Sequence, residues 1–208
     1  MAIAGLAVGV LSLLVAAAAV WFARSAARAS EKAAVAAVTA ATIEKERHWA
    51  ELKPGLDVNC SRSNPGGEQW TLRVKLVGPV ELGHLDEVTV RIRDKSAYQL
   101  KSPADPERIW GPLRFVPGTG PFLTAEHGSG RADKAGRETR VVRTMPIGEQ
   151  IVYALEPSLP APSWQRHQWQ QEVGSLLRLE IETRRDEVDP WQLFEEIDLG
   201  EEWWKRST

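Results

Sequence analysis

The hydrophobic pattern of this chain changes its period after Pro54, and that change limits the possible folds more than any other feature. Before Pro54 the sequence is rich in Ala, Glu, Lys and Arg, which favours helix. After it, apolar and polar residues alternate; in residues 69–77, Trp70, Leu72, Val74 and Leu76 share one face. Strands with one buried and one solvated face are typical of antiparallel sheets. The sequence therefore predicts a helical N-terminal part followed by a mainly β domain.

Six segments carry such strand signals, and no amphipathic helix of crossover length lies between them. They are residues 56–60, 69–77, 87–94, 149–157, 176–184 and 191–199. Residues 107–116 are a candidate seventh strand, which Pro112 confines to a sheet edge or a bulge. We therefore expect an antiparallel immunoglobulin-like or fibronectin-like β-sandwich over residues 56–200, with a C-terminal tail at 201–208.

The N-terminal segment contains no charged residue from position 2 to position 23. At ~1.5 Å per residue such a helix is roughly 33 Å long, enough to cross the hydrocarbon core of a bilayer. A secretory signal would normally begin with Lys or Arg, and none precedes this run. Trp21 and Phe22 stand at its end, where aromatic rings favour the membrane interface. We expect a transmembrane helix at residues 1–23.

The flanking charges predict the orientation of this helix. Arg24, Arg28 and Lys32 follow it, and cationic residues are retained on the cytoplasmic side. The expected arrangement is a single-pass membrane protein with a helical juxtamembrane stalk at residues 24–53 and a cytoplasmic C-terminal domain. Gly5 and Gly9 form one GxxxG step, which suggests a homodimer through close helix packing.

A polar connection near the C-terminus contains the candidate binding residues. In residues 161–172, Trp164 and Trp169 flank Arg166 and His167. Aromatic rings around a cation and an imidazole can form a recognition surface for a sugar, a peptide or a protein partner. The same residues can instead form a short helix that covers one open end of the sandwich. The sequence leaves both interpretations open.

Catalytic and metal-binding motifs are not found in the sequence. The histidines are far apart and none has a second His or Cys at metal-ligand spacing. They are His48, His84, His127 and His167. Cys60 falls on the buried side of its strand, which favours an inert core thiol. Glu180 and Glu182 share a solvated face with Arg178 and Arg184, which indicates a charge ladder. We expect no enzyme activity, no metal and no cofactor.

The remaining composition limits the partners. With 26 Lys and Arg against 28 Asp and Glu, the net charge of −2 gives no basic surface for nucleic acid. Residues 124–142 contain three glycines and almost no apolar residue before Val141, so we expect a disordered or hairpin-like loop there. The expected partners are the lipid bilayer and a protein that meets the loops or an open sheet edge.

A family resemblance agrees with this layout. The stretch "MPIGEQIVYALEPSLPAPSWQRHQW", followed by "LLRLEIETRRDEVDPWQLFEEIDL", resembles the C-terminal part of uncharacterised single-pass membrane proteins of actinobacteria. The resemblance implies an Ala-rich N-terminal span, a helical stalk and a small β-sandwich domain, and it carries no known activity. "PIGEQIVY" is similar to the turn before the tyrosine of fibronectin-like domains, whose hydroxyl caps a nearby backbone group; this implies such a role for Tyr153.

Two functions follow from these expectations. The first is a membrane-anchored protein that presents a β-sandwich interaction domain in the cytoplasm. The alternative is an exported, membrane-tethered module whose domain lies outside the cell and binds a glycan or a peptide.

Overall fold

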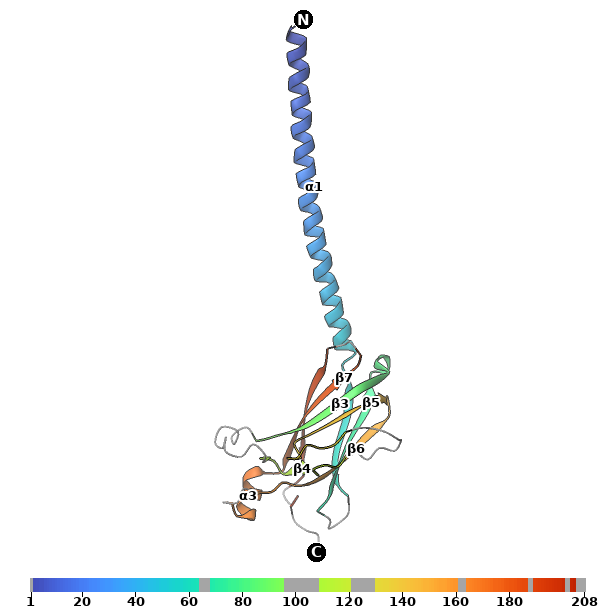
Figure 1. Cartoon of the computed structure of the whole chain (residues 1–208), viewed down its shortest axis with the longest axis vertical. Coiled ribbons are helices and arrows are strands. Elements are labelled where there is room, and N and C mark those ends of the chain that lie inside the picture. Colours follow the sequence, from blue (N-terminus) through green and yellow to red (C-terminus); the bar gives the residue numbers. More distant parts are fainter. Residues whose placement is uncertain are drawn as a thin grey trace. The chain divides into compact units, whose positions relative to one another are not determined.

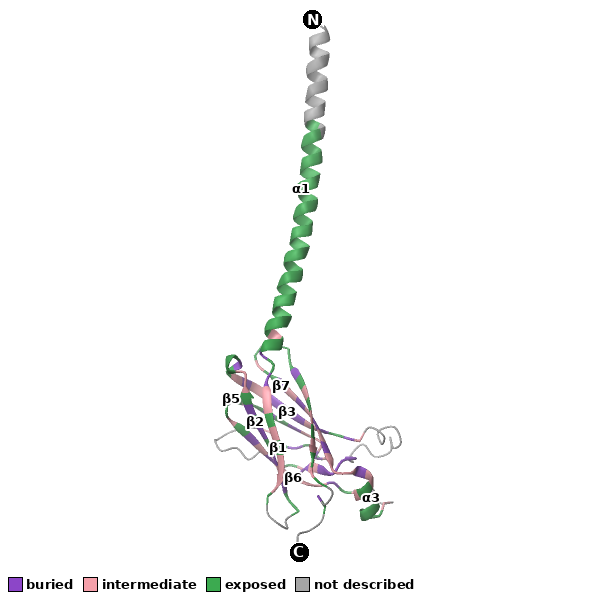
Figure 2. Cartoon of the chain, turned by 180° about the vertical axis from the view of Figure 1, so that it is seen from behind, coloured by how far each residue is buried: buried purple, intermediate pink, exposed green. Residues whose placement is uncertain are grey.

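A computed structural model of the chain describes residues 2–63, 68–95, 109–120, 130–160, 164–186, 189–200 and 203–204. The chain divides into two compact units, Met1–Glu51 and Leu52–Thr208. The first unit is one helix, α1 (Ala2–Glu51), in which backbone but not side chains is described at residues 2–15 and 17. Its described side chains are exposed, apart from the half-buried Trp49 (Figure 2).

Among the described residues, no helix is both long enough and apolar enough to cross a membrane. The transmembrane helix expected at residues 1–23 lies mostly outside the described side chains. The same holds for Gly5 and Gly9, the residues of the expected homodimer contact.

The second unit consists of two four-stranded antiparallel sheets (Figure 1). One has the strand order β1-β2-β6-β4 and the other β5-β3-β7-β8. The elements are β1 (Gly55–Arg62), β2 (Trp70–Gly78), η1 (Val80–Leu82), β3 (His84–Arg93), β4 (Leu113–Phe115), β5 (Glu138–Pro146), β6 (Gln150–Pro157), α3 (Arg166–Val173), β7 (Leu176–Arg184) and β8 (Trp191–Asp198). The mainly β class and the two antiparallel sheets predicted from the alternating pattern are confirmed.

The strand order matches the immunoglobulin arrangement in part. In one sheet β1, β2 and β6 are neighbours, like strands A, B and E of the immunoglobulin fold. In the other sheet β3, β7 and β8 are neighbours, like strands C, F and G. The two remaining strands depart from it. Here β4, the edge strand beside β6, comes before β5, the edge strand beside β3, in the chain. In the immunoglobulin fold the edge strand beside C comes before the edge strand beside E. β4 lies at a sheet edge, as Pro112 predicts for this segment.

The prediction of a loop over residues 124–142 is wrong from Glu138 onward, where β5 begins. Residues 124–129 lie outside the described residues. On its inner face β5 buries Thr139, Val141 and Met145, but the inner position between Val141 and Met145 is occupied by Arg143. Its apolar signal was therefore too weak to recognise. Residues 138–146 form a strand because they pair with β3, although their own sequence lacks a strong alternation of apolar and polar residues.

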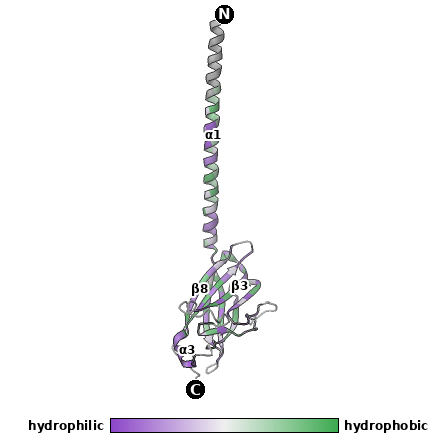
Figure 3. Ribbon diagram, turned by 60° about the vertical axis from the view of Figure 1, so that its left-hand side comes forward, coloured by the Kyte–Doolittle hydropathy of each residue, from purple (hydrophilic) through white to green (hydrophobic). Residues whose placement is uncertain are grey.

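The core lies between the two sheets. Alternating residues of the strands point into it, including Leu72 and Val74 of β2 and Leu179 and Ile181 of β7, all at most 1% exposed. Hydrophobic and hydrophilic residues accordingly follow one another along the strands (Figure 3). Backbone hydrogen bonds join the end of β4 and the segment after it to the segment before β5: Phe115 N donates to Gly136 O at 2.8 Å, and Gly118 N donates to Ala132 O at 3.2 Å. Gly136 has a φ of +71°, and a Cβ there would collide with the Phe115 carbonyl oxygen, so this position requires glycine.

Among the described residues Tyr153 caps no backbone group, contrary to the implied role. Its ring packs edge-on against Phe115 with 5.5 Å between centroids, and the residue is 2% exposed. Its hydroxyl has no hydrogen-bond partner within the described part of the chain. Burial raises the pKa of this phenol. Tyr153 is therefore a core residue of the sandwich.

The solvated face of the second sheet carries the charge ladder. Arg91 of β3 lies 2.7 Å from Glu138 of β5 and 3.1 Å from Glu182 of β7, and Glu180 is 3.4 Å away. Hydrogen bonding to Glu138 raises the pKa of Arg91, and hydrogen bonds from Arg184 and Arg91 lower the pKa of Glu182. Glu182 is therefore held charged by its neighbours, and Glu180 extends the ladder through its ion pairs with Arg91 and Arg93.

Cys60 of β1 is half-buried, and burial raises the pKa of its thiol to about 12. At neutral pH almost none of this thiol is the thiolate that reacts as a nucleophile. Its environment is that of a packing residue.

Candidate functional site

The segment with the candidate binding residues forms the short helix α3. Trp169 and Val173 are one turn apart on its inner face, and both are at most 2% exposed. Gly174, with a φ of +72°, follows the helix, and Lys95 Nζ donates a 2.9 Å hydrogen bond to the carbonyl oxygen of Glu172 in its last turn. The helix therefore covers one end of the sandwich, and Trp169 anchors it.

Three tryptophans pack together beneath α3. The Trp110 and Trp169 ring centroids are 4.6 Å apart, and Trp164 lies 5.6 Å from Trp110 and 6.4 Å from Trp169. We call Trp110, Trp164 and Trp169 the tryptophan cluster. Because two members come from the polar connection and one from the segment before β4, the cluster joins parts of the chain that are remote in sequence.

Asp94 connects the tryptophan cluster to the second sheet. It follows β3 and is 9% exposed. Its Oδ1 accepts a 2.8 Å hydrogen bond from the Trp110 backbone N–H, and its Oδ2 lies 2.8 Å from Arg137 Nη1. Ser158, after β6, adds backbone and side-chain hydrogen bonds to Pro112 and Gly111. The cluster therefore rests on a buried polar network.

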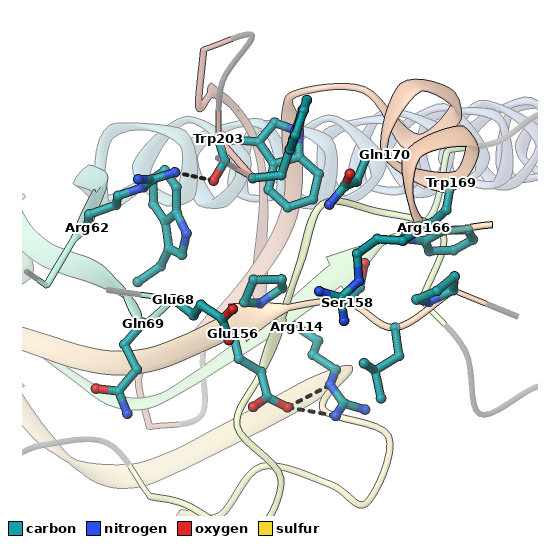
Figure 4. Close-up of a pocket in the computed structure, with 15 residues that line it drawn as sticks. Arg62, Glu68, Gln69, Arg114, Glu156, Ser158, Arg166, Trp169, Gln170 and Trp203 are labelled. Carbon is teal, nitrogen blue, oxygen red and sulfur yellow. Dashed lines mark hydrogen bonds and ion pairs between the residues drawn. The ribbon is translucent and has the colours of Figure 1, made fainter. Parts of the chain in front are cut away.

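The cavity beside α3 is the strand-end pocket, a cleft of about 290 Å³ (Figure 4). Its walls come from the ends of β1, β2, β4 and β6, from α3 and from the C-terminal segment. It is lined by Arg62, Glu68, Gln69, Trp70, Arg114, Glu156, Pro157, Ser158, Leu159, Pro160, Arg166, Trp169, Gln170, Trp203 and Trp204. Strand ends and connections commonly form binding sites because a rigid scaffold positions them.

One wall of the pocket is built by Arg62. Its Nη2 donates a 2.6 Å hydrogen bond to the Trp203 carbonyl oxygen, and its guanidinium lies 5.2 Å from the Trp70 ring centroid. Trp203 itself is 3% exposed. These contacts hold the C-terminal segment against the start of β2 (Figure 4).

The floor of the pocket holds a closed ion pair. Arg114 of β4 and Glu156 of β6 are directly opposite in register, and the Arg114 Nε and Nη2 atoms lie 2.8 and 2.7 Å from Glu156 Oε1. This pair neutralises itself. The other cationic wall residue, Arg166, is exposed and has no ion pair or hydrogen bond to any residue that the structure describes. With three arginines against two glutamates, the lining is positively charged by one unit.

The rim of the pocket is apolar. Leu159 is 54% exposed and Trp204 is 40% exposed, and Pro157 and Pro160 lie beside them. Exposed large apolar side chains next to polar groups are typical of interaction sites. A volume close to the ~300 Å³ lower limit of small-molecule pockets suits a single anchoring side chain.

The structure brings three of the four candidate residues together and leaves His167 apart: Trp164 and Trp169 share the tryptophan cluster, and Arg166 and Trp169 both line the strand-end pocket. Trp169 is buried in the tryptophan cluster, and its indole Nε1 has no hydrogen-bond partner among the described residues. Trp164 is half-buried in that cluster, Arg166 lines the strand-end pocket, and His167 is exposed outside the pocket lining. Arg62, Arg114, Glu156 and Trp203 were not recognised as pocket residues, since nothing local in the sequence links them.

One further grouping brings metal-ligand atoms together. The side chains of His84, Asp86 and Asp186 have ligand atoms within 4.8 Å of one another. Asp86 already lies 3.4 Å from His84 and accepts a 2.7 Å hydrogen bond from the Asp186 backbone N–H. The exposed Asp186 comes from a connection about 100 residues away, so sequence spacing did not reveal this grouping. These contacts explain the cluster without an ion.

No family model matches the chain, and no curated protein matches it. A cohesin module from a Clostridium perfringens family 33 glycoside hydrolase is similar with a TM-score of 0.40 and 8% identity. The match covers 71% of this chain and 96% of that module.

Proposed function

We propose that the β-sandwich is an interaction domain that binds an acidic segment of a partner protein at the strand-end pocket. The main support for this proposal is that two of the three pocket arginines are held by other residues and the third is not. Arg62 and Arg114 are held by Trp203 and Glu156, whereas Arg166 has no such contact within the described residues. A guanidinium beside exposed apolar side chains favours a ligand with a carboxylate next to an apolar group.

The pocket size supports an anchoring side chain rather than a large ligand. An apolar side chain of the partner would contact Leu159 and Trp204 at the rim, and its neighbouring carboxylate would face Arg166. Tryptophan and arginine are the residue types that contribute most to protein interfaces.

Two small probes with the same apolar body test this proposal. N-acetylleucine carries a carboxylate, and N-acetylleucinamide does not. We expect the full-length chain to bind the carboxylate about five-fold more tightly, measured from the indole N–H shifts in NMR titrations. Arg166→Gln should remove the preference, because it deletes the cation and keeps a polar side chain of similar length.

His167→Gln is the matched control, since His167 is exposed on the same helix but does not line the pocket. It should leave the preference unchanged. Equal binding of the two probes by the unaltered chain would contradict the proposal. Binding of N-acetylglucosamine oligomers instead would favour the alternative, an exported glycan-binding module.

We propose further that α1 attaches this domain to a membrane. The charge-free residues 2–23 and the following Arg24, Arg28 and Lys32 support a single pass with the domain in the cytoplasm. A fluorescent reporter fused to the C-terminus should fluoresce in the membrane fraction, and a reporter that is active only outside the cell should stay silent. Activity of the outside reporter contradicts the orientation, and recovery of the chain without membranes contradicts the anchor.

A further inference from the structure

The strand β8 is an open edge of the second sheet. It pairs with β7 over residues 191–198 without a register shift, and no other described strand is hydrogen-bonded to it. Beyond the strand end, Leu199 N donates to Ser175 O at 3.1 Å. Antiparallel pairs alternate between bonded and non-bonded positions, so the odd-numbered residues of β8 bond to β7. The backbone groups of Gln192, Phe194, Glu196 and Asp198 therefore point away from the sheet.

The other three edges are irregular, short or joined to neighbouring segments. β1 has a register shift after Gly55, and the pairing of β5 with β3 is shifted between Leu85 and Glu87. β4 spans residues 113–115 only, and Phe115 N bonds to Gly136 O at its end. Such features hinder strand addition. β8 is regular over its eight residues and contains no proline, no lysine and no bulge.

The side chains of β8 indicate the chemistry of a partner. Glu195, Glu196 and Asp198 give the strand three acids and no base, and Glu196 forms a 2.8 Å ion pair with Arg178 of β7. Glu195 is half-buried and has no ion pair with any residue that the structure describes. Phe194 is 58% exposed on the solvated face, with the Arg93 guanidinium 5.2 Å from its ring centroid. Like charges opposite one another destabilise a strand pair, so a second copy of β8 is a poor partner.

We propose that β8 binds an extended, basic segment of a partner protein by strand addition. The outward backbone groups would supply the hydrogen bonds. Lys or Arg side chains on one face of the added strand would meet Glu195, and the apolar side chains alternating with them would lie beside Phe194 on the other face. This surface shares no residue with the strand-end pocket, so either proposal can fail without the other.

The test uses the full-length chain and a short blocked peptide of alternating lysine and valine, with a glutamate and valine peptide as its matched control. Without peptide, the amides of Gln192, Phe194 and Glu196 should exchange with solvent faster than those of Leu193 and Glu195. The basic peptide should slow the exchange of these outward amides on the order of tenfold, and the acidic peptide should not.

Phe194→Pro deletes an outward N–H that does not bond to β7, and should weaken peptide binding on the order of tenfold. Phe194→Ala keeps that N–H and separates the loss of the ring from the loss of the hydrogen bond. If the proline variant does not fold, the paired reversal Glu195→Lys and Glu196→Lys provides the test, because the acidic peptide should then bind better. Equal binding of both peptides, protection of amides outside β8, or self-association through β8 would overturn the proposal.

Discussion

Replacing Trp169 with alanine is expected to lower the free energy of unfolding of the β-sandwich by about 3–5 kcal/mol. Trp169 is 1% exposed and packs against Trp110 and Trp164, so the substitution leaves a large cavity beneath α3. For a domain of this size, that corresponds to a fall in Tm on the order of 10 °C. Urea denaturation followed by circular dichroism measures the change.

Two variants of the same helix serve as controls for this result. Trp169→Phe keeps an aromatic ring and removes the indole N–H that has no partner among the described residues, so it should cost less than half as much. His167→Ala alters an exposed position and should change stability by less than about 0.5 kcal/mol. A Trp169→Ala loss below about 1 kcal/mol would show that the tryptophan cluster is not a packed core.

Replacing Asp94 with alanine is expected to lower the free energy of unfolding by about 2–4 kcal/mol. The substitution removes the carboxylate that accepts hydrogen bonds from the Trp110 backbone N–H and the Arg137 guanidinium. The Arg137 side chain is 31% exposed, so water can solvate part of its charge after the substitution. The expected loss of stability is therefore smaller than for a fully buried ion pair. Thermal unfolding of the full-length chain measures the change.

A double-mutant cycle separates the two interactions of Asp94. If Arg137→Ala and Asp94→Ala are combined, the loss should be smaller than the sum of the single losses by about 1 kcal/mol, because both remove the same ion pair. Asp57→Ala, at an exposed position of β1, is the matched control and should be nearly neutral. Additive losses would show that Asp94 acts through Trp110 alone.

The strands with strict alternation were predictable because each one carries the full signal in its own sequence. β2, β3 and β7 each bury three or more apolar side chains on one face. β5 was not predictable. Its core-facing positions include a threonine, and Arg143 stands between Val141 and Met145, so its pairing with β3 contributes what its own pattern lacks.

The candidate site was predictable only where its residues are local. Trp164, Arg166 and Trp169 stand together in the sequence, and the helix alternative correctly anticipated their role at the end of the sandwich. The other pocket residues come from distant segments: Arg62 and Trp203, joined by a hydrogen bond, are 141 positions apart. From a single sequence it is not possible to predict which strand ends lie side by side in the folded domain.

By itself, the sequence determined the mainly β class, the alternating strands and the long N-terminal helix, because these depend on periods of 2 and 3.6 within short segments. The tertiary structure alone decided which edge strands stay open, which arginine is left without a partner among the described residues, and how the tryptophan cluster closes the domain. Those features depend on the order of strands within each sheet and on contacts between remote residues. Both proposed binding surfaces belong to this second class, since a free backbone edge or an unpaired cation is defined only by what the folded chain places beside it.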